Sequence, residues 1–207
     1  MAHFTPPCAR SKPFDTLLAV TTWFGGRMLA RKKIEVIGAG KLGETLIKAL
    51  LEAKVVEPEQ ITATTRHPET SERKAKAYGI TATTDNAAAA KNADIIIVSV
   101  KPQVMAEALA SIKKVVGKNQ IVISTAASVS TGFIERALGS GVPVIRTMPN
   151  TACLVRAGMT GICAGKHARR EQLALAEGIF SAMGRVLVLD EKYMDAVTGL
   201  SASGIAF

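Results

Sequence analysis

The chain has 207 residues, of which 48% are hydrophobic, 4% aromatic and 21% charged. This length and composition can bury a substantial core, which excludes a disordered or fibrous protein, and the apolar stretches fall short of the roughly 18 to 20 residues of a membrane span. The net charge is +9, but residues 1–33 carry +5 of it and the remaining 174 residues only +4. We therefore expect neither a nucleic-acid nor a membrane partner.

The first 31 residues differ in composition from the rest of the chain. They combine prolines, an apolar stretch at 16–24 and one acid, Asp15. Such a segment is compatible with an organellar transit peptide, a secretory signal, or an extension before a natural start at Met28. We predict that residues 1–31 are a poorly ordered extension or targeting leader. The expected location is cytoplasmic, or mitochondrial or plastidic if the leader is a transit peptide.

Cysteine and histidine usage excludes further classes. Cys8, Cys153 and Cys163 are an odd number without a Cys-x-x-Cys pair, which indicates neither a disulfide framework nor a zinc site. The three histidines are far apart in sequence. We expect a reducing compartment and no metal.

From residue 34 onwards, short apolar strands alternate with amphipathic helices. Strands are expected at 34–37, 60–65, 80–83, 94–100, 120–124, 142–146, 159–164 and 185–189. Helices are expected at 42–53, 69–78, 86–91, 102–116, 130–138, 169–183 and 191–200. The continuous apolar strand at 94–100 is typical of a parallel sheet covered on both faces. This alternation predicts an α/β fold with an open, doubly wound, mainly parallel sheet.

A glycine motif between the first strand and the first helix is the strongest local signal. Gly38 permits a tight turn, Gly40 lets the backbone approach a pyrophosphate, and Gly43 allows the helix to pack closely on the strand. The N-terminus of the helix supplies N–H donors and a favourable dipole. The motif therefore predicts dinucleotide binding by six consecutive residues, Gly38, Ala39, Gly40, Lys41, Leu42 and Gly43.

The end of the second strand indicates which dinucleotide is bound. An acid there would accept hydrogen bonds from a free ribose 2′-hydroxyl, but this chain has Thr64, Thr65 and Arg66, with no acid before Glu69. Hydroxyls and a guanidinium suit a 2′-phosphate, which favours NADP over NAD. The alternative is that Arg66 is an ordinary solvated loop residue.

Further candidate residues follow later strands. In a doubly wound sheet the carboxyl ends of the strands form the ligand crevice, which places Lys101 and Pro102 near the nicotinamide and residues 124–127 along the cofactor. Pro102 is equally explained as the first residue of a helix. Two polar loops, at 146–151 and 195–204, are either ordinary turns or parts of the site.

Four motifs in this order and spacing resemble the pyrroline-5-carboxylate reductase family. They are the glycine motif, SVKPQ at 99–103, TMPNT at 147–151 and DAVTGLS at 195–201. The resemblance implies a Rossmann-type NADP-binding domain at 32–190, followed at 191–207 by the start of an all-helical domain for dimerisation and substrate binding. Because the chain stops soon after this start, we expect it to be truncated. The family also implies a homodimer or higher homo-oligomer.

The resemblance further implies roles for individual residues. Thr65 and Arg66 would hold the 2′-phosphate, and Asn86 the adenosine side. The nicotinamide side would be lined by Val100, Lys101, Pro102, Ala126 and Ala127. Substrate would be bound by Asn150, Ser201, Ser203 and Gly204, with Lys101, Ser201 and Ser203 as catalytic residues. The chain departs from the usual family motifs at Ala152, Ala202 and Ile205.

The activity implied is NADPH-dependent reduction of 1-pyrroline-5-carboxylate to proline, by hydride transfer to a cyclic imine. Such a reaction needs no metal or protein nucleophile, and no Ser-His-Asp, Cys-His or carboxylate-pair pattern stands out in the sequence. One alternative is an NADP oxidoreductase similar to 3-hydroxyacid dehydrogenases. Another is a nucleotide-binding fragment without catalysis.

Overall fold

The computed structural model describes residues 28–139 and 141–203. Most of the predicted leader, residues 1–27, and the predicted site residue Gly204 therefore lie outside the described residues. The packed structure begins earlier than the expected start at Lys32, because the side chain of Leu29 is 0% exposed within the core. Gln60 Nε2 fixes this segment by donating to the carbonyl oxygens of Leu29 (2.7 Å) and Lys32 (2.9 Å).

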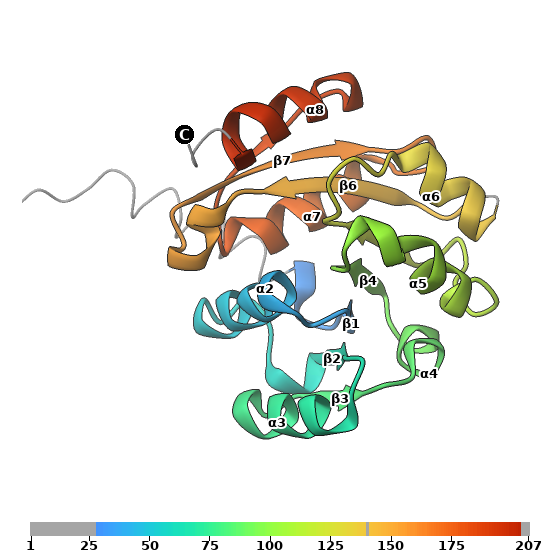
Figure 1. Ribbon diagram of the computed structural model, residues 1–207, viewed down its shortest axis with the longest axis vertical. Helices are drawn as coiled ribbons and strands as arrows, with labels where there is room; N and C mark the ends of the chain where they lie inside the picture. The colour runs from blue at the N-terminus through green and yellow to red at the C-terminus, as the bar shows by residue number, and fades with distance from the viewer. Residues whose placement is uncertain (1–27, 140, 204–207) are drawn as a thin grey trace, which may run out of the picture.

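The described strands form one sheet in the order β3-β2-β1-β4-β5-β6-β7-β8, which confirms the predicted doubly wound, mainly parallel α/β fold (Figure 1). The strands are β1 (Ile34–Ile37), β2 (Ile61–Thr64), β3 (Thr81–Thr83), β4 (Ile95–Val98), β5 (Ile121–Ser124), β6 (Val144–Pro149), β7 (Gly158–Ala164) and β8 (Gly184–Val188). The α-helices are α2 (Lys41–Glu52), α3 (Pro68–Tyr78), α4 (Asn86–Lys91), α5 (Met105–Ile112), α6 (Thr131–Leu138), α7 (Arg170–Ser181) and α8 (Met194–Val197).

Helices cover both faces of the sheet and bury a core on each. Leu46 and Leu50 of α2 and Phe180 of α7 belong to the core of one face. Met105 of α5 and Ile134 of α6 belong to the core of the other. The four residues of β4 are all buried, as expected of a strand enclosed between two helical layers.

One pair of strands departs from the parallel arrangement. β6 and β7 run antiparallel, with Arg146 opposite Cys163, whereas β7 and β8 are parallel again. Residues 150–157 join β6 to β7, and this connection contains only the 3₁₀ helix η3 (Thr151–Val155). A parallel crossover needs about a dozen residues or more, so the short connection dictates an antiparallel return.

Two predicted helices are shorter or less regular than expected. The helix predicted at 102–116 divides into the 3₁₀ helix η2 (Pro102–Val104) and α5, which ends at Ile112. The helix predicted at 191–200 consists of the 3₁₀ helix η4 (Glu191–Tyr193), α8 and the π-helix η5 (Thr198–Ser203). Thr198 Oγ1 donates to the Met194 carbonyl oxygen (2.9 Å), and this kind of back-bond disturbs the regular α-helical ladder.

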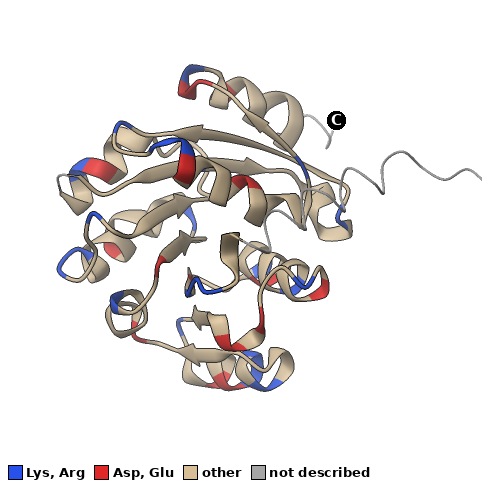
Figure 2. Ribbon diagram, turned by 180° about the vertical axis from the view of Figure 1, so that it is seen from behind, with Lys and Arg blue, Asp and Glu red and all other residues tan. Residues whose placement is uncertain are grey.

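Charged residues of both signs are interspersed over the helices and loops of the described chain (Figure 2). None of the described helices has the length and apolarity needed to cross a membrane. Within the described residues, His, Cys, Asp and Glu side chains form no group of three or more suited to a metal ion.

A carboxylic acid is buried in the centre of the sheet. Glu35 of β1 is 0% exposed, and neither of its carboxylate oxygens has a hydrogen-bond partner. Side chains alternate along a strand, so Glu35 lies on the same face as Ile37, beneath α4 and α5. Loss of hydration raises the pKa of Glu35 from 4.5 to about 9, which keeps the side chain protonated and neutral at neutral pH.

The raised pKa of Glu35 predicts that the stability of the protein depends on pH. Between pH 4.5 and about 9 the unfolded chain loses this proton and the folded chain keeps it. The free energy of unfolding should therefore fall as pH rises through this window, by at most about 1.4 kcal/mol per pH unit from this group. Glu35→Gln, which cannot ionise, should remove that slope in urea titrations at a series of pH values. The exposed Glu59→Gln variant is the control, and equal slopes in wild type and Glu35→Gln would contradict the assignment.

Candidate functional site

The crevice of the sheet lies where the strand order reverses, at the carboxyl ends of β1 and β4. Gly38 follows β1 with a φ of +81°, a conformation that side chains disfavour. A Cβ atom on Gly38 would lie 2.5 Å from Val100 Cγ1 and 2.9 Å from the Ser99 carbonyl oxygen. The turn after β1 therefore requires glycine, because it passes directly against the segment that follows β4.

The N-terminus of α2 opens beside this turn. Gly40 is its N-cap and provides no side-chain cap, and a Cβ atom there would meet nothing within 4 Å. The N–H groups of the first helical turn have no partner within the helix. A Cβ on Gly43 would lie 2.8 Å from the Gly38 carbonyl oxygen, so the third glycine permits close helix–strand packing. Uncapped donors beside open space fit a pyrophosphate.

A pocket of about 290 Å³ continues from this turn. The pocket is bounded by the ends of β1 and β2, the start of α4, the loop after β4 and one face of α5. Its lining residues are Ile37, Gly38, Thr64, Thr65, Arg66, Thr84, Asn86, Val100, Val104, Glu107, Ala108 and Ser111. The structure thus brings together the glycine turn, Arg66 and Asn86, which are far apart in sequence.

Arg66 and Thr65 differ in their availability to a ligand. Arg66 is exposed and makes no hydrogen bond or ion pair with any described residue. Thr65 Oγ1 donates to the His67 carbonyl oxygen (2.9 Å) and also lies 2.8 Å from Ser71 Oγ. Ser71 Oγ in turn donates to the Thr83 carbonyl oxygen (3.0 Å). The Thr65 hydroxyl is thus committed to the turn, while the guanidinium of Arg66 is open to an anion.

An ion pair fixes α2 against α3, the two helices that flank these loops. Lys74 Nζ of α3 lies 2.6 Å from Glu44 Oε2 of α2, and Tyr78 OH donates to Glu44 Oε1 (2.9 Å). The hydrogen bond from Lys74 lowers the pKa of Glu44, although partial burial acts in the opposite direction. The pair couples the glycine turn to the segment that carries Arg66.

The predicted nicotinamide-side residues follow β4 and β5. Lys101 is exposed and precedes Pro102, the first residue of η2, so the role of Pro102 as a helix starter is confirmed. Ala126 is 3% exposed, and Ala127 is half-buried. Thr125 N donates to the Val98 carbonyl oxygen (3.2 Å), which holds the two strand ends together. These residues therefore lie at the same edge of the sheet as Gly38.

Asn150 and Ser201 come together from distant parts of the chain. Asn150 Nδ2 donates to Ser201 Oγ (3.2 Å), and Asn150 Oδ1 accepts from the backbone N of Met159 (3.1 Å). Asn150 follows β6, so the pair lies beyond the carboxyl end of a strand parallel to β5. The predicted turn at Ser201 is instead part of η5, whose backbone includes Ser203. The side chain of Ser203 lies outside the described part.

Sequence reasoning missed the network that fixes this segment. Arg146 of β6 has a side chain only 5% exposed, and its guanidinium lies 3.5 Å from Glu191 Oε1 and 2.9 Å from Asp195 Oδ1. Glu191 Oε1 accepts from Thr131 N (2.7 Å) and Glu191 Oε2 accepts from Thr131 Oγ1 (2.6 Å). Glu191 therefore connects the segment before α8 to β6 and to the N-terminus of α6. The dipole of α6 favours a carboxylate at this end of the helix.

Two sequence signals could have indicated this network. Arg146 is the one charged residue of the buried strand β6, and a buried charge requires a partner. Glu191 and Asp195 are four residues apart, a spacing that places both on one side of a helical segment. Cys163, opposite Arg146 on β7, remains a neutral thiol because burial, reinforced by Glu191, raises its pKa to about 11.

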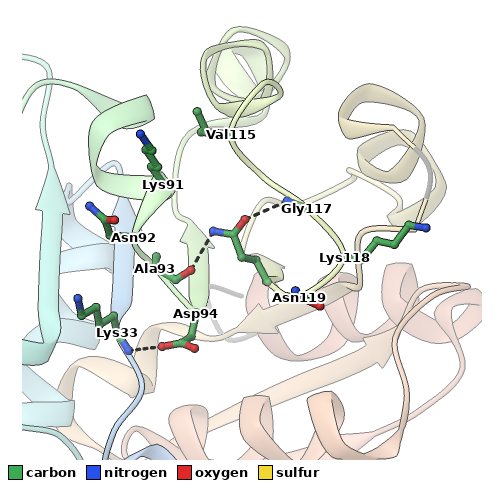
Figure 3. A pocket seen from close by; sticks show the side chains of 10 residues that line it. Lys33, Lys91, Asn92, Ala93, Asp94, Val115, Gly117, Lys118 and Asn119 are labelled. Carbon is green, nitrogen blue, oxygen red and sulfur yellow. Dashed lines mark hydrogen bonds between the residues drawn. The ribbon is translucent and has the colours of Figure 1, made fainter.

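A larger hollow, of about 470 Å³, lies at the opposite, amino-terminal edge of the strands (Figure 3). The side chains of Asp94 and Gln120, which line it, already have partners. Asp94 accepts from Lys33 N (2.9 Å) and Lys32 Nζ (3.2 Å). Gln120 accepts from Gly117 N (2.9 Å) and donates to the carbonyl oxygens of Ala90 and Ala93. These bonds tie neighbouring loops together. The smaller pocket adjoins the glycine turn at Gly38, which makes it the better functional site.

The strand order and the glycine turn at its crevice define a dinucleotide-binding protein of the Rossmann class. Residues 33–128 match the family model described as NADP oxidoreductase, coenzyme F420-dependent. Over 180 residues the chain is 42% identical to pyrroline-5-carboxylate reductase of Methanosarcina acetivorans. The chain belongs to the pyrroline-5-carboxylate reductase family, in agreement with its four motifs.

Solved structures of the same family match the fold. The pyrroline-5-carboxylate reductase from Coxiella burnetii superposes with a TM-score of 0.81 at 32% identity, covering 84% of this chain and 65% of that one. The Plasmodium falciparum pyrroline carboxylate reductase with NADP bound gives a TM-score of 0.76 at 26% identity, covering 85% and 64%. The Methanosarcina alignment covers 86% of this chain and 66% of the relative. The chain thus spans slightly less than two thirds of the relatives it matches.

The Glu191 network predicts a specific loss of stability. Glu191→Ala removes both bonds to Thr131 and leaves the buried Arg146 with only the exposed Asp195. We expect the free energy of unfolding, measured by urea titration, to fall by about 2 kcal/mol. The adjacent exposed Lys192→Ala is the matched control, and we expect it to change stability by less than about 0.5 kcal/mol. Equal losses in the two variants would show that Glu191 does not hold the segments together.

Proposed function

We propose that this chain provides the cofactor-binding part of an enzyme that reduces 1-pyrroline-5-carboxylate to proline with NADPH. The observation that carries the proposal is the common position of two sets of groups. The glycine turn at Gly38 and the Asn150–Ser201 pair both lie at the carboxyl edge of one sheet. The 42% identity to the Methanosarcina acetivorans reductase supports the choice of substrate.

NADP is the proposed cofactor, with NADPH favoured over NADH. The uncapped N-terminus of α2 would receive the pyrophosphate, and the exposed Arg66 would pair with the 2′-phosphate. No acid stands at the end of β2 to repel that phosphate. The NADP bound in the Plasmodium falciparum relative agrees with this choice. When bound, the reduced cofactor supplies the hydride.

The remaining cofactor contacts are assigned by position. Lys41 and Leu42 begin α2, beside the pyrophosphate, and Asn86 lies in the pocket on the adenosine side. The nicotinamide half would lie along Val100, Lys101, Pro102, Ala126 and Ala127. Thr65 is a weaker candidate for the 2′-phosphate than Arg66, because its hydroxyl is engaged within its own turn.

In this reaction the protein has to align the two reactants and provide charge beside them. A cyclic imine protonated in water is already electrophilic, so the protein has to place the imine carbon against the nicotinamide and orient the substrate carboxylate. Ser201, Ser203 and Gly204 would bind that carboxylate through hydroxyl and N–H donors. Asn150 would hold the Ser201 hydroxyl in place through the bond of 3.2 Å. Lys101 would add a positive charge beside the cofactor.

The proposal extends to the domains, the oligomeric form and the compartment of the enzyme. We assign residues 32–190 to the cofactor-binding domain and 191–207 to the beginning of a helical domain for substrate binding and dimerisation. A homo-oligomer in the cytoplasm is the proposed working form. The two described cysteines, Cys153 and Cys163, are free and buried, which suits a reducing compartment.

Activity can be tested with this chain and with a longer one. The longer chain would carry, after Phe207, the part of the Methanosarcina acetivorans relative that lies beyond its matched region. Oxidation of NADPH on addition of pyrroline-5-carboxylate is measured for both, with NADPH binding as the parallel readout. We expect both chains to bind NADPH and at least the longer one to turn over substrate. If both chains bind NADPH and neither turns over substrate, the reductase activity is contradicted.

Arg66 provides a test of cofactor choice. Arg66→Asp replaces a donor for the 2′-phosphate by a repelling carboxylate, so affinity for NADPH should fall by about tenfold or more while that for NADH should not fall. The ratio of the two dissociation constants, measured by titration, is the readout. Lys76→Asp makes the same charge change on the exposed side of α3 and should leave the ratio unaltered. An unchanged ratio in Arg66→Asp would remove Arg66 from the site.

A further inference from the structure

One face of α5 and its preceding turn forms a wall of the pocket. Four lining residues, Val104, Glu107, Ala108 and Ser111, are spaced three, one and three positions apart. This spacing places them on a single helical face. Val104 and Ala108 are apolar and offer a surface for a flat ring. Glu107 and Ser111 carry polar groups beside it. This wall belongs to the pocket that the proposed function assigns to the adenosine half of the cofactor.

Hydrogen bonds already made within the wall determine what it can still offer. Asn86 Nδ2 donates to Ser111 Oγ (3.1 Å), and Ser111 Oγ donates to the Ala108 carbonyl oxygen (2.6 Å). Asp85 fixes the start of α4 by accepting from the N–H groups of Ala87 and Ala88, which orients Asn86. The donors of Ser111 and one donor of Asn86 are therefore used. Asn86 Oδ1 and the carboxylate of Glu107 remain as acceptors.

The side chain of Glu107 is exposed and makes no hydrogen bond or ion pair with any residue of the described chain. Its place in the first turn of α5 suits the helix dipole and leaves the carboxylate free for a ligand. The one cation that lines the pocket, Arg66, follows β2, whereas α5 follows β4, and these two strands flank β1 on opposite sides. The pocket thus places a cation on the β2 side and a carboxylate on the α5 side.

The two charged sides of the pocket suit the two ends of an adenosine 2′-phosphate. The phosphate on the ribose is a pure acceptor and suits Arg66, whereas adenine carries an exocyclic 6-amino group that only donates. A 6-oxopurine places a carbonyl oxygen at that position, and this oxygen would face the Glu107 carboxylate with no proton between them. Sites that hydrogen-bond a donor reject an analogue that lacks it more strongly than apolar pockets do.

We propose that Glu107 is a specificity-determining residue, which accepts a hydrogen bond from the 6-amino group of adenine and makes the pocket selective for 6-aminopurine dinucleotides. The inference rests on the proposed function, because it takes the occupant of the pocket to be the adenosine half of NADP. The apolar residues Val104 and Ala108 support the ring, and the Asn86–Ser111 bond closes the pocket between α4 and α5.

The test compares two ligands that differ at one position of the base. NADP and its deaminated analogue, nicotinamide hypoxanthine dinucleotide phosphate, are titrated against the intact chain by calorimetry. The wild type should bind NADP about tenfold or more tightly than the analogue, the effect of one hydrogen bond to a charged group. Glu107→Ala should weaken NADP binding by a similar factor and leave the analogue unaffected or improved, so that the two affinities converge. Glu107→Gln, which offers both a donor and an acceptor, should also reduce the discrimination.

Glu171→Ala is the matched control, because Glu171 is likewise an exposed helical glutamate but lies on α7, away from the pocket. It should keep the wild-type ratio. If the wild type binds both dinucleotides equally, or if Glu107→Ala retains the discrimination, Glu107 does not read the base, although NADP binding would still stand. Tighter NADP binding by Glu107→Ala would mean that Glu107 repels the 2′-phosphate, and it would overturn the proposal. Failure of the wild type to bind NADP at all would instead refute the proposed function.

Discussion

The close approach of two chain segments at Gly38 is the constraint on which the site depends. The turn after β1 passes so near Val100 and the Ser99 carbonyl that even a methyl group would not fit. This approach brings the loops after β1 and β4 together at the point where the sheet changes direction. The same turn leads into α2, whose first N–H groups have no side-chain cap. Gly43 lets that helix lie against the Gly38 carbonyl oxygen. Three missing side chains thus create both the crevice and its anion-binding donors.

The C-terminal segment is attached to this frame by charge as well as by apolar burial, since Met194 of α8 is 0% exposed. Arg146 emerges from a buried strand, and Glu191 binds it while also accepting two hydrogen bonds from Thr131 at the start of α6. One carboxylate therefore sets the position of the chain that leads to Ser201. Asn150 completes the attachment, with its amide shared between Met159 and Ser201. Because the partners of a buried charge are costly to remove, this arrangement fixes the direction of the segment as well as its place.

Sequence patterns predicted the strands and helices around the crevice because the physical signals there are local. Apolar β-branched runs such as the one in β4 specify a buried parallel strand, and Gly38 and Gly43 specify a turn and a close packing contact. The antiparallel return of β7 was not predicted, since it follows from the length of a connection and not from periodicity. The partners of Arg146 were missed because they lie 45 or more positions away in the chain, which no local pattern encodes. The π-helix at Thr198–Ser203 was missed because periodicity does not reveal the back-bond from Thr198 to the Met194 carbonyl oxygen.

The two edges of the sheet differ in a way that explains why only one of them forms a site. At the amino-terminal edge, Asp94 and Gln120 use their polar atoms on neighbouring loops, so these two side chains have little left to offer a ligand. At the carboxyl edge, Arg66 and Glu107 have no partner among the described residues, and Ser99 Oγ is buried without one. The exposed Arg66 and Glu107 are hydrated in the empty protein, and a ligand of complementary polarity replaces that water with direct hydrogen bonds. The location of binding is therefore set less by the size of a hollow than by the groups that line it, and only the hollow at the crevice combines the glycine turn at Gly38 with Arg66.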